Sequence, residues 1–127
     1  MEKSFDQRVA EAVAEVSRVS PREASRRAEN DRDTLFLDPR NAEDIRSTTG
    51  IIPGAVNVTL DQLGSRAEEY LPPELRSRTR PIITACEGGP MGALAAYELK
   101  KRGYREVHFI DGGTQAWLDE GFATTKQ

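Results

Sequence analysis

Residues 84–92 read TACEGGPMG and contain Cys86, the only cysteine of the chain. Before this cysteine, residues 82–84 are β-branched and follow a proline, a pattern that predicts a short buried strand. After it, residues 92–102 are rich in good helix formers and stop at a glycine, which predicts a helix. Only five residues, two of them glycine, separate Cys86 from Gly92. The cysteine is therefore expected at the rim of a tight loop from strand to helix.

A loop of this composition suits a reactive thiolate. Gly88 and Gly89 tolerate positive φ angles and let a ligand come close to the backbone. Successive N–H groups of such a loop can point inward and form an anion-binding site. The positive end of the following helix also favours negative charge there. Both features favour the charged form of Cys86, which is a strong nucleophile. A lone cysteine is more often a small buried hydrophobic residue, but the Gly-Gly-Pro loop before a helix reverses that preference.

Length and composition indicate one soluble domain. A chain of 127 residues can bury one hydrophobic core and leaves little room for a second. The net charge of −3 argues against a general nucleic-acid or membrane-surface binder. One cysteine permits neither an internal disulfide nor a cysteine-based metal cluster. The charged N-terminus is unlike a secretory signal, no segment approaches a membrane span, and an exposed thiol needs a reducing compartment, so we expect a cytoplasmic protein.

The N-terminal part of the chain predicts two helices. From Ser4 to Val19, apolar residues recur every three or four positions, which is typical of an amphipathic helix. We therefore treat residues 1–19 as a helical extension and residues 20–127 as the main domain. Ser20, with proline next to it and glutamate three positions later, forms a capping box for a second helix that reaches about Arg27.

The rest of the chain alternates between strands and helices. Short apolar runs predict strands at residues 35–37, 56–58, 82–84 and 107–110. Helices are expected at residues 43–46, 61–70 and 92–102, and between Gly113 and Gly121. This alternation over short connections predicts an α/β domain with a mainly parallel sheet.

One edge of that sheet is expected to carry the functional site, because ligands of such sheets gather outside the carboxyl ends of the strands. Asp38, Cys86 and Asp111 all follow predicted strands and so meet at this edge. Three arginines precede the strand at 82–84 and belong to the opposite edge, where we expect them to be solvated. They are Arg76, Arg78 and Arg80.

Several short motifs follow one another between Ser20 and Gly121. They are SPREA at 20–24, Asp38-x-Arg40, GIIPGA at 50–55, Cys86-x-x-Gly89, Gly103-Tyr104, and Gly112-Gly113 with Trp117. Each is weak alone, but their order and spacing are highly specific. With these motifs the chain resembles a single-domain rhodanese, a sulfurtransferase.

The resemblance implies a three-layer α/β domain with a five-stranded, mainly parallel sheet and helices on both faces. It implies that Cys86 takes sulfane sulfur from a donor, thiosulfate or a persulfide, and passes it to a thiol or cyanide acceptor by a two-stage, ping-pong route. Asp38 and Arg40 are implied to be structural, and no cofactor or metal is implied. Backbone N–H groups of six loop positions are implied to cradle the outer sulfur of the Cys86 persulfide: Glu87, Gly88, Gly89, Pro90, Met91 and Gly92.

Two loop positions depart from the usual family pattern. Met91 stands where family members often have arginine, and Glu87 directly follows the cysteine. A guanidinium would bind an anionic donor and stabilise the thiolate, whereas methionine does neither. Glu87 adds a negative charge beside the thiolate. We therefore expect thiosulfate to be a poor donor and a protein or low-molecular-weight persulfide to be a better one.

An apolar flank leads from the loop into the following helix. Met91, Leu94 and Tyr97 are spaced three residues apart and share this flank. It could dock a protein sulfur partner beside the thiol, or the N-terminal helix could cover it with apolar residues such as Phe5. We favour the cover.

Other cysteine chemistry fits the sequence less well. Phosphatase and arsenate-reductase loops need an arginine at the position that Gly92 occupies here. The only histidine, His108, lies in a predicted strand, which argues against a cysteine hydrolase, and metal ligands at suitable spacing are missing. The remaining alternative is a rhodanese-like module that binds or regulates without catalysis. The departures from the family pattern at Glu87 and Met91 leave this alternative open.

Overall fold

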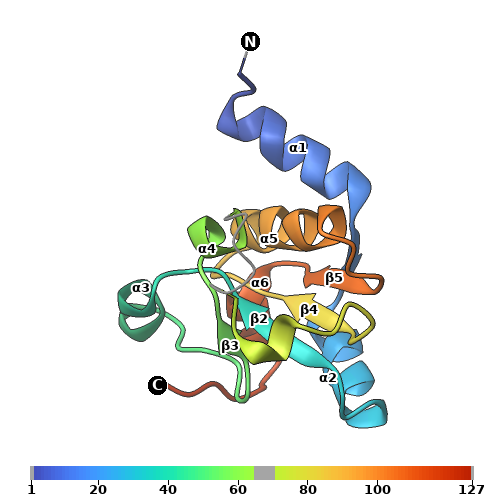
Figure 1. Ribbon diagram of the computed structural model, residues 1–127. Helices are drawn as coiled ribbons and strands as arrows, with labels where there is room; N and C mark the ends of the chain where they lie inside the picture. The colour runs from blue at the N-terminus through green and yellow to red at the C-terminus, as the bar shows by residue number, and fades with distance from the viewer. Residues whose placement is uncertain (1, 65–70, 127) are drawn as a thin grey trace.

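The five strands of the sheet run parallel, as the computed structural model shows for the residues that it describes, 2–64 and 71–126 (Figure 1). Their order across the sheet is β1-β5-β4-β2-β3. The predicted α/β class and the five-stranded parallel sheet are confirmed. The strands are β1 (Ser17–Val19), β2 (Leu35–Asp38), β3 (Val56–Asn57), β4 (Ile82–Thr84) and β5 (Val107–Ile110).

Helices cover both faces of the sheet, so the domain has three layers (Figure 1). Helices α4 and α5 pack on one face, whereas α2 and α6 pack on the other. Within the described residues, none of the helices combines the length and the apolar character needed to span a bilayer. The helices are α1 (Phe5–Glu15), α2 (Pro21–Asn30), α3 (Ala42–Ser47), α4 (Leu60–Gly64), α5 (Pro90–Lys101) and α6 (Gly113–Asp119), with a 3-10 turn η2 (Pro73–Leu75).

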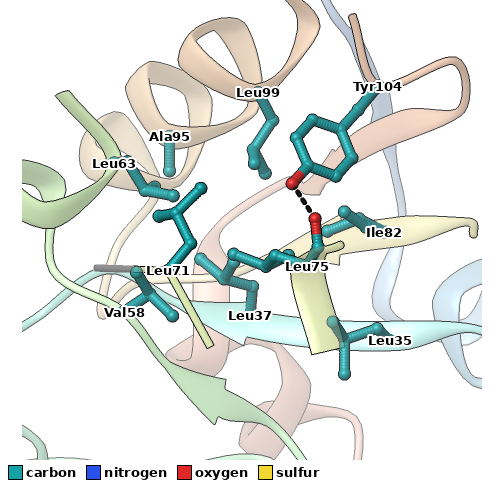
Figure 2. Packing of buried hydrophobic residues seen from close by; sticks show 10 residues of the cluster. All are labelled: Leu35, Leu37, Val58, Leu63, Leu71, Leu75, Ile82, Ala95, Leu99 and Tyr104. Carbon is teal, nitrogen blue, oxygen red and sulfur yellow. Dashed lines mark hydrogen bonds between the residues drawn. The ribbon is translucent and has the colours of Figure 1, made fainter. Parts of the chain in front are cut away.

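Alternate residues of the central strands face opposite layers. Leu35 and Leu37 of β2 join a core cluster with Leu99 of α5, which Figure 2 shows. Phe36, between them, joins the cluster on the other face with Trp117 of α6. Because side chains of a strand alternate between faces, one short apolar strand serves both cores. The indole of Trp117 packs edge-on against Phe36 at 5.5 Å between ring centres, so this residue has a packing role.

The first strand corrects the expectation of one helix from Ser4 to Val19. Helix α1 ends at Glu15, and Val16 turns into extended backbone with φ −123° and ψ 150°. Residues 17–19 then pair with β5 as the edge strand β1. The three-residue spacing of Val16 and Val19 matches a helix, so local periodicity could not reveal that residues 17–19 pair with β5 instead.

Helix α1 covers α5, as expected. Ala12 and Val16 are buried against Leu94, and Tyr97 is half-buried beside them. In Figure 1, α1 lies on the side of α5 that faces away from the sheet. The apolar flank of α5 therefore has an intramolecular partner over most of its length, while Met91 lies beyond this contact, in the pocket described below.

Two of the three arginines before β4 are not simply solvated, which corrects that expectation. Arg78 is half-buried, donates hydrogen bonds to the carbonyl groups of Leu75 and Arg102, and lies over the ring of Tyr104. Arg80 donates to the carbonyl of Asp33 at 2.6 Å. Both side chains donate to backbone carbonyl groups of loops at the amino-terminal edge of the sheet. They thereby supply hydrogen bonds that these carbonyl groups need.

The bounds of several other helices also differ from the prediction. Helix α2 continues to Asn30, three residues beyond the expected end at Arg27. The helix expected at 61–70 begins at Leu60 and is described to Gly64, while residues 65–70 lie outside the described residues.

Candidate functional site

Cys86 lies just beyond the carboxyl end of β4, where the chain turns toward α5. The residue is only 3% exposed, yet it lines an open pocket of about 460 Å³. Its Sγ atom accepts a hydrogen bond from the N–H of Gly89, with N and Sγ 3.0 Å apart. Cys86 is therefore a buried residue in the lining of a pocket, with a backbone donor directed at its sulfur.

The loop conformation depends on Gly89. Its φ of 129° is one that residues with a side chain rarely adopt. It is also the N-cap of α5, and Pro90 follows as the first helical residue. Pro90 has no N–H, so at most five of the six positions from 87 to 92 could donate to a bound sulfur. The contact from Gly89 exists in the structure, and the wider ring of amides stays a prediction.

Helix α6 holds the loop from behind. The N–H of Thr114 donates to the carbonyl of Cys86 at 2.7 Å, and the N–H of Gln115 donates to the carbonyl of Glu87 at 3.0 Å. A side chain at Gly113 would lie 2.7 Å from the carbonyl oxygen of Cys86, so only glycine allows this approach. Gly113 thus lets α6 fix the backbone of Cys86 and Glu87.

A buried hydrogen bond joins β4 to the first turn of α5. The hydroxyl of Thr84 donates to the carbonyl of Gly92 at 2.6 Å, and both residues are buried. Gly92 therefore lies in the helix, behind the loop. No arginine stands at this position to close a phosphate-binding loop.

Asp38 and Arg40 form a buried ion pair beside the pocket. The guanidinium binds the carboxylate through Nε at 3.0 Å and Nη2 at 2.7 Å. It also donates to the hydroxyls of Thr48 and Thr49 and to the carbonyl of Gly50. Arg40 is 4% exposed, so this guanidinium is committed to the segment between β2 and β3.

Three parts of the chain form the pocket walls. The loop supplies most of the lining residues, the segment after β2 supplies Arg40, Asp44 and Thr48, and α1 supplies Phe5. Asp44 and Glu87 are exposed, and both bring negative charge to the pocket. The lining residues from the loop are Cys86, Glu87, Gly88, Pro90 and Met91.

The sequence predicted the loop and the neighbouring Arg40, but it did not predict Asp44 or Thr48 as pocket residues. Phe5 was expected to cover the apolar flank of the helix after the loop, and not to line a cysteine pocket. Asp44 lies in the first turn of α3, where Asn41 accepts its N–H. Only distant folding brings either of them to the cysteine. Asp111, expected at the same edge, is not among the pocket residues and instead pairs with Arg18 at 3.5 Å.

His108 is not placed to serve Cys86. It lies on β5 outside the pocket, and its Nε2 atom is 2.9 Å from Nη1 of Arg27. Burial lowers the pKa of His108, and the neighbouring Arg27 guanidinium lowers it further. Because the guanidinium can only donate, Nε2 accepts and the proton of the neutral ring lies on Nδ1. No group of three or more His, Cys, Asp or Glu residues in the described chain could hold a metal ion.

Comparisons with known proteins agree with this arrangement of motifs. The family model of the rhodanese-like domain matches residues 20–120. The chain is 32% identical over 106 residues to the adenylyltransferase and sulfurtransferase UBA4 of Candida albicans, covering 81% of this chain and 24% of that protein. It is 35% identical over 91 residues to the tRNA uridine(34) hydroxylase of Bradyrhizobium diazoefficiens, covering 69% of this chain and 34% of that protein.

A solved structure resembles the whole chain, including α1. It is a protein of unknown function from Rhodopseudomonas palustris, described as a possible tyrosine phosphatase. The TM-score is 0.84 at 23% identity, and the match covers 98% of this chain and 96% of that one. This likeness concerns the fold alone. The curated relatives named above are longer, and the chain spans only about a quarter to a third of their length. By the match over residues 20–120 and the cysteine loop within it, the chain belongs to the rhodanese-like family.

Proposed function

We propose that the chain is a sulfurtransferase domain that carries sulfane sulfur as a persulfide on Cys86. The observation that carries this proposal is the buried Cys86 among the residues that line an open pocket, with its Sγ atom accepting the N–H of Gly89. A sulfur bonded to Sγ would extend into the pocket, beside the amino terminus of α5, where its negative charge is favoured. The relation to a protein named as a sulfurtransferase supports the same chemistry.

The reaction has two balanced steps. The Cys86 thiolate attacks the outer sulfur of a persulfide donor, a new S–S bond forms at Sγ, and the donor's S–S bond breaks with its electron pair leaving on the donor thiolate. An acceptor thiolate then attacks the outer sulfur on Cys86. The Sγ–S bond breaks, its electron pair returns to Cys86, and the acceptor leaves as a persulfide.

The charges of the pocket favour a persulfide over thiosulfate as the donor. Thiosulfate is a dianion, and the pocket presents two carboxylates, Asp44 and Glu87. Among the described lining residues the only basic one is Arg40, which is bound to Asp38. Met91 supplies no positive charge where a guanidinium would help. A low-molecular-weight or protein persulfide meets less repulsion.

Mass spectrometry of the intact protein tests the proposal. After incubation with a low-molecular-weight persulfide, we expect a gain of one sulfur mass, located at Cys86 and absent from Cys86→Ser. With thiosulfate at the same concentration, we expect loading to be at least about tenfold slower, because charge repulsion of this kind costs about 1.4 kcal/mol or more. Equal loading by both donors would refute the donor preference. Repeated absence of sulfur with both donors would instead support a rhodanese-like binding module.

A further inference from the structure

Phe5 is an apolar residue in an unusual place. It is 54% exposed, the only large hydrophobic residue so exposed in the described part of the chain. It lines the pocket that also contains Cys86 and Met91. Residue 5 lies outside the region matched by the family model, which begins at residue 20. The helix that precedes the matched domain thus contributes directly to the wall of the cysteine pocket.

The position of Phe5 is fixed by the helix that it begins. The hydroxyl of Ser4 accepts the N–H of Gln7 at 3.1 Å, and the Gln7 side chain accepts the N–H of Ser4 at 2.8 Å. This capping box makes Phe5 the first residue of α1. An ion pair between Lys3 and Glu11 adds to this turn. Farther along, α1 is anchored on α5 by its buried residues, so Phe5 stands on a supported element and not on a loose terminus.

The pocket mouth combines an apolar surface with negative charge. Phe5, Pro90 and Met91 supply the apolar part, while Asp44 and Glu87 supply the carboxylates. An anionic thiol would be repelled by these carboxylates, and in the part of the chain that the structure describes the one basic lining residue, Arg40, is already paired with Asp38. An uncharged thiol with an apolar group next to sulfur would instead bury that group against the phenyl ring.

We infer that Phe5 is a specificity-determining residue of the sulfur-transfer site, selecting acceptor thiols that carry an uncharged, apolar group beside the sulfur. This inference rests on the proposed function. The ring acts in the second step: the acceptor thiolate attacks the outer sulfur of the Cys86 persulfide while its carbon group lies against Phe5. The S–S bond to Sγ breaks, and the electron pair stays on Cys86.

Steady-state transfer to three acceptor thiols tests the role of Phe5. The acceptors are 2-phenylethanethiol, which is apolar, 2-mercaptoethanol, which is small and uncharged, and 3-mercaptopropionate, which is anionic. For the natural chain, kcat/KM should follow that order. In Phe5→Ala, the KM for 2-phenylethanethiol should rise about tenfold, and the KM for 2-mercaptoethanol should change less than about twofold. Phe5→Leu should recover most of the loss.

Val13→Ala is the matched control, because Val13 lies on the same helix, packs against α5 and does not line the pocket. It should leave the preference among the thiols unchanged. Equal effects of Phe5→Ala on both uncharged thiols, or no effect on either, would overturn the inference. Sulfur loading of the natural chain is measured first. If Cys86 gains no sulfur, the proposed function and this inference fail together; if it does but the thiols are not distinguished, only the inference fails.

Discussion

Single residues around Cys86 act mainly through the backbone. Gly89 directs an N–H to the sulfur, and Gly113 lets the amino end of α6 reach the carbonyls of Cys86 and Glu87. Neither glycine provides a reactive group. Each permits a close approach that a side chain would block, and the geometry of the site depends on both.

Gly113→Ala should damage the site and the fold together. An alanine here would have to adopt a φ of 65°, and its Cβ would lie 2.7 Å from the carbonyl oxygen of Cys86. The strain and the clash should lower the free energy of unfolding by about 2–3 kcal/mol and displace the loop. Gly121→Ala is the control, because Gly121 also has a positive φ but nothing within 4 Å, so only about 1 kcal/mol should be lost. Chemical denaturation and sulfur loading measure both effects. Similar losses in the two variants would contradict this explanation.

At the scale of elements, α1 and β1 have different roles although they are adjacent in sequence. Helix α1 covers α5 through a small apolar cluster that includes Ala12, with Val9 and Val13 packed against it. Strand β1 adds an edge to the sheet by pairing with β5. A helix docked on another helix can be removed without breaking a sheet, whereas a paired strand cannot.

Two deletions should separate these roles. Removing residues 2–15 exposes Leu94 and its neighbours and should cost about 3 kcal/mol of unfolding free energy. Removing residues 2–19 also leaves β5 without its partner on that side and should cost clearly more. Thermal and chemical unfolding compare the two. Equal stability of both shortened chains would show that β1 contributes nothing to the sheet.

At the scale of the whole molecule, the parallel sheet gathers the site from distant segments. The carboxyl ends of β2 and β4 bring Arg40 and Asp44 to the loop of Cys86, and α1 adds Phe5 from above α5. The opposite side of the sheet holds α2 against β5, where Arg27 meets His108. The contact between Arg27 and His108 joins a residue near the beginning of the region matched by the family model to one near its end.

The His108 contact predicts how stability depends on pH. Burial and Arg27 lower the pKa of His108 below 6.5, although Glu106 and Glu23 oppose this in part. The unfolded chain therefore takes up the proton first. The stabilising contribution of the neutral ring is present above about pH 6.5 and is lost as pH falls from there toward the lower pKa of the folded chain. The free energy of unfolding should fall more for the natural chain than for His108→Gln between pH 7.5 and 5. Parallel curves would disprove the linkage.

The cysteine loop could be predicted from local pattern alone. β-branched residues before Cys86, glycines after it and helix formers beyond them each favour one local structure, and all three predictions agree with the observed elements. The same holds for the alternation of strands and helices, since it depends on the nearest neighbours along the chain. The local order of elements around Cys86 was therefore already present in the sequence.

The edge strand and the pocket walls could not be predicted in this way. Residues 17–19 become a strand because β5, about ninety positions later, offers free backbone groups. Phe5 and Asp44 reach Cys86 only after α1 has docked on α5 and β2 has paired with β4. The sequence by itself determined the loop around Cys86 and the parallel α/β class, because these follow from short-range preferences. Only the tertiary structure decided which side chains surround the sulfur, because contacts between distant residues have no signature in local spacing.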